Sequence, residues 1–401
     1  MTKSIQFWIK FSLLNLLIVA LFGLLMRYKI GFEFPYLNQK NLQHAHSHFA
    51  FAGWISHSLM CFMIYFLEKN NLLKHPKTYQ RIIISNLLCS YGMLVFFTFQ
   101  GYAFASILFS TLSIVVAYVF AYVFWKNVKT VEFNTIVKNW FKAGLVFNVL
   151  SSLGTFYLAY MMASKDIHEK QYLASIYFYL HFQYNGWFSF IVLGLFHDYF
   201  KLNQQKYVKI FWLFCIACIP TYFLSTLWLE LPIWIYSLTI AGAIIQTYAW
   251  FRFVYYFIQD KRNDLHQIPF FLRYILLFIG FAMSVKLLLQ LGSTVPSVSK
   301  LAFGFRPIVI AYLHLVLLAI ISLSILFYGY STQLIRNNKA IKLGILIFTV
   351  GVIVNELILA VQGIASFSYT LIPYVDKMLF GAAIILVSGI GITAFSSIKE
   401  E

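Results

Sequence analysis

Three histidines recur along this chain at a constant stride: His48, His181 and His314 are each separated from the next by 133 residues. The first begins the run HFAFAGW and the second begins HFQYNGW, so histidine, phenylalanine, glycine and tryptophan coincide in both runs. The third run, HLVLLAI, keeps only the histidine of this pattern. Self-similarity at a fixed period indicates a repeated structural module. Because imidazole nitrogen is a common ligand of haem iron, copper and zinc, the repeat predicts a metal or haem function.

The segments that carry these histidines are predicted to cross a membrane. Of 401 residues, 61% are hydrophobic and only 11% are charged, a composition far more apolar than that of an ordinary soluble domain. Apolar stretches long enough to cross a bilayer, about 20 residues each, can be marked along the whole chain. The sequence therefore predicts an all-α polytopic membrane protein of twelve helices. The predicted spans are 5–26, 46–67, 80–101, 103–125, 139–161, 173–196, 207–227, 233–257, 268–291, 305–329, 341–366 and 375–397.

The net charge of +17 indicates membrane topology and not nucleic-acid binding. Lysine and arginine concentrate in alternate loops, including the cluster Lys69, Lys74, Lys77 and Arg81. By the positive-inside rule these loops are cytoplasmic, which predicts that both the N-terminus and the C-terminus lie inside. We therefore expect a multi-pass protein of a bacterial-type inner (cytoplasmic) membrane, with lipid as its surroundings and no nucleic-acid partner.

The stride divides the predicted helices into three sets of four. The loops are short, so we expect one transmembrane domain over 1–401, with internal repeats at about 1–133, 134–266 and 267–401. The second helix of each set carries the repeated histidine and begins on the outer side. The three imidazoles should therefore share one layer in the outer half of the bilayer. Because lipid cannot satisfy a polar ring, each should face the protein interior.

Two further histidines precede the first repeated one. His44 and His48 are separated by four residues and share a helix face, whereas His46 points about 160° away from them. One helix cannot aim all three at a single ion, so two destinations are needed if all three are ligands. Lys286 and Glu356, inside other predicted spans, indicate either a structural ion pair or an internal path for protons or substrate.

Twelve spans in three sets, with histidines on the second, sixth and tenth, resemble the catalytic subunit of the haem–copper oxidases, including the nitric-oxide reductases. The stretches HAHSHFAFAGW and YLHFQYNGWF are also similar to runs in the smaller NnrS-like membrane proteins. The resemblance implies that His48 and His314 bracket a low-spin haem b. It also implies that His181 lies on the helix that supplies a copper ligand. Arg306, at the outer end of its helix, is a candidate partner of the haem propionates or a plain interfacial anchor.

The chain departs from that family at the oxygen-reducing centre. Range 207–227 lacks the two adjacent copper-ligand histidines, and Tyr312 stands where the tenth helix would carry its second histidine. We therefore expect electron transfer or handling of a diatomic gas such as nitric oxide, with a quinol or a cytochrome as electron donor. Whether the chain is an oxidoreductase stays open.

Two alternatives remain. Three equivalent histidines around a pseudo-threefold axis could form one copper or zinc site, in which His46 could also take part. A secondary transporter also fits twelve spans with internal repeats, although such repeats are usually two halves.

Overall fold

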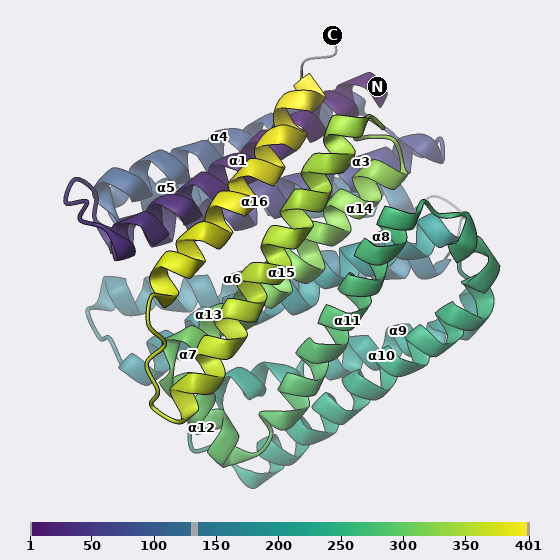
Figure 1. Ribbon diagram of the computed structural model, residues 1–401. Coiled ribbons are helices and arrows are strands. Elements are labelled where there is room, and N and C mark those ends of the chain that lie inside the picture. Colours follow the sequence, from purple (N-terminus) through teal and green to yellow (C-terminus); the bar gives the residue numbers. More distant parts are fainter. Residues whose placement is uncertain (1, 130–134, 399–401) are drawn as a thin grey trace. The chain divides into compact units, whose positions relative to one another are not determined.

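The computed structural model describes residues 2–129 and 135–398, and every regular element among them is a helix (Figure 1). The predicted all-α class is therefore confirmed for this part of the chain. Contacts within the chain divide it into two compact units, the first made of residues 1–131 and 322–401 and the second of residues 132–321. The predicted repeat boundary near residue 133 lies outside the described residues, and the second unit ends within the third predicted repeat.

Nine helices among the described residues are long and apolar enough to cross a membrane. The number rises to ten if the bent segment Gln204–Thr226 is counted as one span. The remaining two predicted ranges, 173–196 and 233–257, are helical but less apolar. The first of them carries His181, Gln183 and Asn185, which lower its hydropathy. The chain is thus a helical protein with at least nine membrane-capable helices in its described part, as a multi-pass membrane protein requires.

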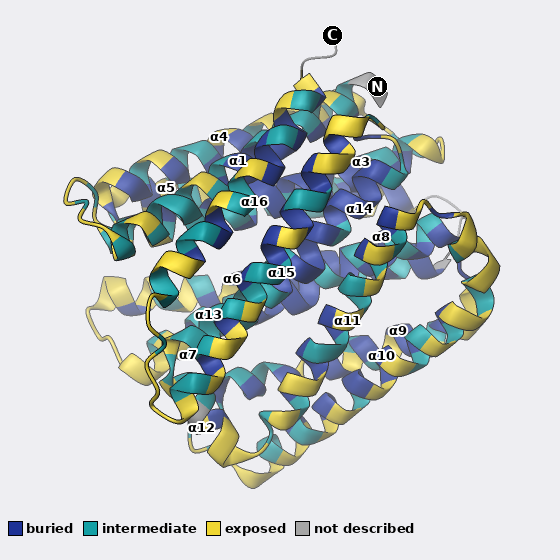
Figure 2. Ribbon diagram, viewed as in Figure 1, coloured by how far each residue is buried: buried dark blue, intermediate teal, exposed yellow. Residues whose placement is uncertain are grey.

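The continuous helical segment formed by α2, η1 and α3 is mostly buried. Figure 2 shows buried residues in dark blue. In the most apolar stretch of this segment 83% of the residues are buried, against 17% in α5. The elements of this unit are α1 (Thr2–Gly31), α2 (Gln39–Phe49), η1 (Ala50–Ser56), α3 (His57–Lys69), α4 (Pro76–Gln100), α5 (Phe104–Lys129), α14 (Leu323–Ser331), α15 (Lys339–Phe367) and α16 (Val375–Ile398). Helix α1 packs against α2, η1 and α3 on one side and against α16 on the other.

Glycines allow α15 and α16 to approach closely. A Cβ atom on Gly389 would lie 2.3 Å from the Phe348 backbone nitrogen, and one on Gly344 would lie 2.4 Å from the Thr393 hydroxyl oxygen. Small residues at such crossings let two backbones pack directly in an apolar medium, where van der Waals contact is a main source of association. The α15–α16 pair is accordingly the most extensive helix contact of the first unit.

The second unit contains a broken helix. Helix α9 ends at Cys218, the 3₁₀ segment η3 begins at Pro220, and the two are bent by 40°. Proline lacks the N–H that would continue the helical ladder, which explains the break. The elements are α6 (Thr135–Ser164), α7 (Glu169–His181), η2 (Phe182–Phe188), α8 (Ser189–Phe200), α9 (Gln204–Cys218), η3 (Pro220–Thr226), α10 (Ile233–Gln267), α11 (Phe270–Gly292), α12 (Pro296–Gly304), α13 (Arg306–His314) and η4 (Leu315–Ser322), whose last residue belongs to the first unit.

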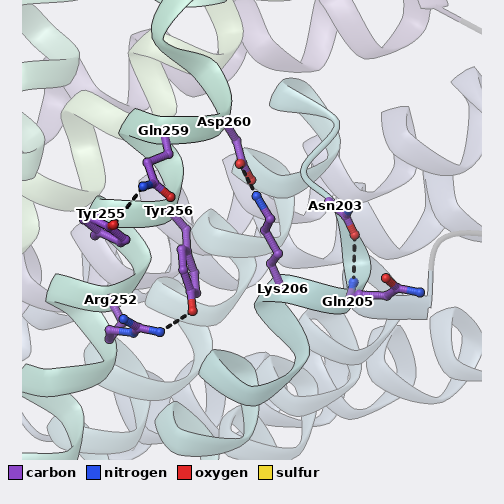
Figure 3. A network of polar contacts seen from close by, with 8 residues as sticks. All are labelled: Asn203, Gln205, Lys206, Arg252, Tyr255, Tyr256, Gln259 and Asp260. Carbon is purple, nitrogen blue, oxygen red and sulfur yellow. Dashed lines mark hydrogen bonds and ion pairs between the residues drawn. The ribbon is translucent and has the colours of Figure 1, made fainter.

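Polar contacts fasten the start of α9 to the end of α10 (Figure 3). The Lys206 ammonium lies 2.5 Å from an Asp260 carboxylate oxygen, and the Asn203 side chain caps the N-terminus of α9. One turn along α10 from Tyr256, Arg252 donates to the Tyr256 hydroxyl and lies over its ring, 4.6 Å from the ring centre. The Lys206–Asp260 pair thus joins the N-terminal end of α9 to α10.

Candidate functional site

Each repeated histidine lies where an α-helix changes into a π-helix. His181 and His314 are the last residues of α7 and α13, and His48 is the residue before the last of α2. The π-helical segments η1, η2 and η4 follow directly. Single-turn π segments within α-helices are uncommon and occur frequently at functional sites. The histidine module predicted from the stride is therefore also a local structural module.

The first module is held by two asparagine amides. The Asn15 side-chain nitrogen donates to the Gly53 carbonyl at 2.6 Å, and that of Asn86 donates to the Ala52 carbonyl at 3.1 Å. The Tyr91 hydroxyl in turn donates to the Asn15 side-chain oxygen at 2.7 Å. Buried polar groups must be paired because water cannot reach them. The amides of α1 and α4 thereby stabilise the wider turn of η1.

His44 and His48 face α4 and the connection that follows it. The His48 ring stacks on Phe97 with ring centres 4.3 Å apart, and its Nε2 lies 3.2 Å from the Tyr102 hydroxyl. The His44 ring meets the edge of Tyr102 at 4.7 Å between centres. The Nε2 atom of His44 is buried and has no hydrogen-bond partner among the described residues. His44 and His48 therefore share one face and one aromatic environment, as the sequence predicts.

His46 points to α1 instead, which agrees with the predicted second direction. Its Nδ1 lies 3.0 Å from the Val19 carbonyl oxygen. A Cβ atom on Gly23 would lie 3.5 Å from the His46 ring, so the glycine leaves room for the imidazole against α1. A ring nitrogen beside a carbonyl must carry the proton, which leaves the Nε2 of a neutral imidazole with the lone pair. This is the arrangement of a ligating histidine, which donates its other nitrogen to a carbonyl or carboxylate.

His181 has both ring nitrogens engaged. Its Nε2 donates to the Cys218 carbonyl at 2.8 Å, and its Nδ1 accepts from the Asn185 amide at 3.0 Å. The ring is only 1% exposed. Its acceptor is the carbonyl at the end of α9, where Pro220 interrupts the helix. The residue predicted as a copper ligand thus fastens η2 to the broken helix.

His314 resembles His46 in its backbone contact. Its Nδ1 lies 3.0 Å from the Ile310 carbonyl oxygen one turn earlier, so its Nε2 also carries the lone pair in the neutral ring. Tyr312, two residues before it, forms a hydrogen bond with Tyr184 of η2. Arg306 is exposed at the first position of α13. A helix rise of about 1.5 Å per residue separates it from His314 by roughly 12 Å along the axis.

The histidines do not gather into a cluster within either unit. Among residues 2–129 and 135–398, no three histidine, cysteine, aspartate or glutamate side chains are arranged to hold one metal ion. Each repeated histidine instead stands singly next to a π segment.

Asn15 and Tyr102 were not predicted from the sequence. The stride contains a signal for the asparagine, because Asn148 stands 133 residues after Asn15 and accepts from Gln183 of η2 at 2.8 Å. Ser56, Ser189 and Ser322 continue the same stride beyond the three histidines. Tyr102 has no such signal, because it lies in a connection between helices.

Comparison with protein-family models and with curated protein sequences finds no match to this chain.

Proposed function

We propose that this chain is a haem- or metal-binding membrane protein in which histidines of the π modules supply the ligands. The observation that carries the proposal is the tautomer of His46 and His314. In each ring the Nδ1–H donates to a backbone carbonyl, which leaves the lone pair of the neutral imidazole on Nε2. A bound haem b or copper ion would supply a one-electron redox centre and a binding position for a diatomic gas.

The residues fit this group unequally. His46 in the first unit and His314 in the second have the backbone hydrogen bond that ligating histidines usually make, so they would hold the group. The Nε2 of His44, which has no partner among the described residues, fits a ligand role as well. His181 fits poorly, because its lone pair accepts from Asn185 and its N–H donates to a carbonyl. These bonds favour a haem over an ion held by all three repeated histidines. His48 would need to release the Tyr102 hydroxyl before ligating.

The resemblance to the haem–copper oxidases supports the finer parts of the proposal. We propose twelve crossings with both termini inside, in a bacterial-type inner membrane, and a role in electron transfer or nitric-oxide handling with a quinol or cytochrome as donor. The missing copper-ligand histidines on α9 argue against dioxygen reduction, since that helix carries none. Arg306, exposed at the outer start of α13, stays the proposed partner of haem propionates.

Spectroscopy and metal analysis of detergent-purified protein test this proposal. We expect a Soret band, a reduced α band after dithionite, and about one iron per chain. Stoichiometric copper or zinc without a Soret band would support the three-histidine ion site instead. Absence of all three metals and of the Soret band from protein expressed with adequate haem would overturn the proposal.

A secondary transporter is the second candidate, and one observation favours it. The α9–η3 segment is bent by 40° at a proline and its last helical carbonyl meets a buried histidine. Broken helices of this kind surround substrate sites in many transporters. Substrate-dependent uptake into proteoliposomes that survives His46→Ala and His314→Ala would favour transport over haem binding.

A further inference from the structure

Lys286 is a buried amine with no carboxylate partner among the residues that the structure describes. It lies on α11, is 2% exposed, and forms no ion pair with any carboxylate of the described residues. Its electrostatic neighbours in the second unit are His181 and Cys218. An isolated ammonium in an apolar interior is costly, so a buried lysine is normally paired or neutral. The burial of a charged Lys286 side chain would therefore require a compensating negative group.

Two buried amide oxygens of the same unit also lack hydrogen-bond partners among the described residues. Gln290 follows Lys286 by one helical turn on α11, is 8% exposed, and its side-chain oxygen has no hydrogen-bond partner among the described residues. The Asn185 side-chain nitrogen donates to His181, and its side-chain oxygen is buried and has no hydrogen-bond partner among the described residues. Buried polar atoms are almost always satisfied, and exceptions indicate an ordered water, an ion or a ligand.

The orientation of the Asn185 amide is fixed by its neighbours. The His181 Nε2 faces the Cys218 carbonyl and must donate, so Nδ1 carries the lone pair. Asn185 must then present its nitrogen to Nδ1, and its oxygen points elsewhere. The unpartnered acceptor is therefore a consequence of the hydrogen-bond network and would persist if other amides were flipped.

The break in α9 provides a further polar group beside His181, the Cys218 carbonyl. The Cys218 carbonyl accepts from His181 at 2.8 Å and from the Thr221 hydroxyl at 3.2 Å. Irregular backbone at membrane depth is tolerated where it is buried in protein or lines a polar cavity. Lys286 and the Asn185 side chain are thus both neighbours of His181, and Gln290 lies one turn from Lys286 on α11; neither amide oxygen has a donor among the described residues.

We propose that Lys286 binds a small oxyanion that keeps one O–H group, of which hydrogencarbonate is a simple example. The negative oxygens of such a ligand neutralise the ammonium. Its O–H donates to the unpartnered oxygen of Gln290 or Asn185. Chloride and formate neutralise the charge but cannot donate, so they bind more weakly.

The test is isothermal titration and thermal unfolding of the purified full-length chain, with sodium hydrogencarbonate, formate and chloride at constant ionic strength and pH. We expect the melting temperature to rise with hydrogencarbonate, and formate and chloride to bind about tenfold more weakly. This comparison needs no bound haem, so it is independent of the proposed function.

Lys286→Met should abolish the anion-dependent rise without loss of folding, because it removes an uncompensated charge and leaves none behind. Gln290→Leu should weaken hydrogencarbonate binding severalfold and leave chloride binding unchanged. Lys300→Met, an exposed lysine of α12 in the same unit, is the matched control and should behave as the wild type.

Equal affinity for hydrogencarbonate, formate and chloride would overturn the requirement for an O–H group. A wild-type protein whose melting temperature and heats do not respond to any of the three anions would overturn the site. If Lys286→Met does not fold, Lys286→Gln and Gln290→Leu carry the same comparison.

Discussion

The first and second histidine modules share a sequence pattern but place their histidines differently. His48 is half-buried beside Phe97 and Tyr102, whereas His181 is fully buried and bonded through both nitrogens. One stride before Asn185 the chain has Ala52, so the first module lacks the amide that holds the second histidine.

The neighbouring helices differ in the same way. One stride before Pro220 the chain has Leu87, and α4 continues unbroken to Gln100, so the helix break beside His181 has no counterpart at the same stride in the first module. Both modules nevertheless share the α-to-π transition. Residues outside the repeat decide what each imidazole does.

The largest difference between the two modules is expected when each histidine is replaced by alanine. His181→Ala leaves the Asn185 amide without its ring acceptor and the Cys218 carbonyl with only the Thr221 hydroxyl, and a buried group left unpaired costs about 1–3 kcal/mol. The missing ring also leaves a cavity. We expect a loss of about 3 kcal/mol of unfolding free energy. His48→Ala should cost less than about 1 kcal/mol, since it removes a long hydrogen bond and one ring contact. Unfolding in detergent by heat or SDS measures both, and equal losses would contradict the assignment.

The glycine common to both modules should also respond unequally. A Cβ atom on Gly186 would lie 2.5 Å from the Cβ of Phe147, which cannot move without its backbone. One on Gly53 would meet the far end of the Phe49 ring at 2.8 Å, which can rotate away. Overpacking costs typically about 1–3 kcal/mol. We expect about 2 kcal/mol for Gly186→Ala and less for Gly53→Ala in the same unfolding assay; the reverse order would mean that η2 is packed more loosely than described.

A smaller difference is expected between Asn15 and Asn148, which stand one stride apart. Asn15→Leu removes the donor to the Gly53 carbonyl and the acceptor of Tyr91, and we expect a loss of about 1–2 kcal/mol. Asn148→Leu should cost less, because Gln183 keeps the Ser151 hydroxyl at 2.8 Å. Melting temperatures of the two variants, each with a normal yield of folded protein, test the difference. Indistinguishable values would contradict a special role for Asn15 at η1.

The smallest effect is expected at Ser322. Its hydroxyl accepts from the Trp54 indole N–H at 2.9 Å, and both residues belong to the first unit. Side-chain hydrogen bonds inside membrane proteins are worth about 0.6 kcal/mol on average. Ser322→Ala should cost about that amount, whereas Trp54→Phe should cost more because Trp54 is 2% exposed and the smaller ring leaves a cavity. The double variant should cost about as much as Trp54→Phe alone. Additive losses in this double-mutant cycle would show that the bond contributes nothing.

The sequence predicts the helical class because apolar length alone specifies it, and it predicts the opposed directions of His46 and His48 because helix periodicity specifies those. The π segments could not be predicted, since they depend on amides from other helices that satisfy the widened turns, such as Asn15 and Asn86. The two hydrogen bonds of His181 could not be predicted either. One of them depends on a carbonyl on α9, 37 residues further along the chain.

The central claim is that imidazoles of these modules hold a haem or metal, and that His181 does not. The most direct measurement is the dithionite-reduced absorbance spectrum of three purified proteins: wild type, His314→Ala and His181→Ala. We predict a Soret and α band in the wild type, loss or a marked shift of the α band in His314→Ala, and an unchanged band position in the folded fraction of His181→Ala. A spectrum altered by His181→Ala and untouched by His314→Ala, or no haem absorbance in any of the three, would contradict the assignment of a haem to these modules.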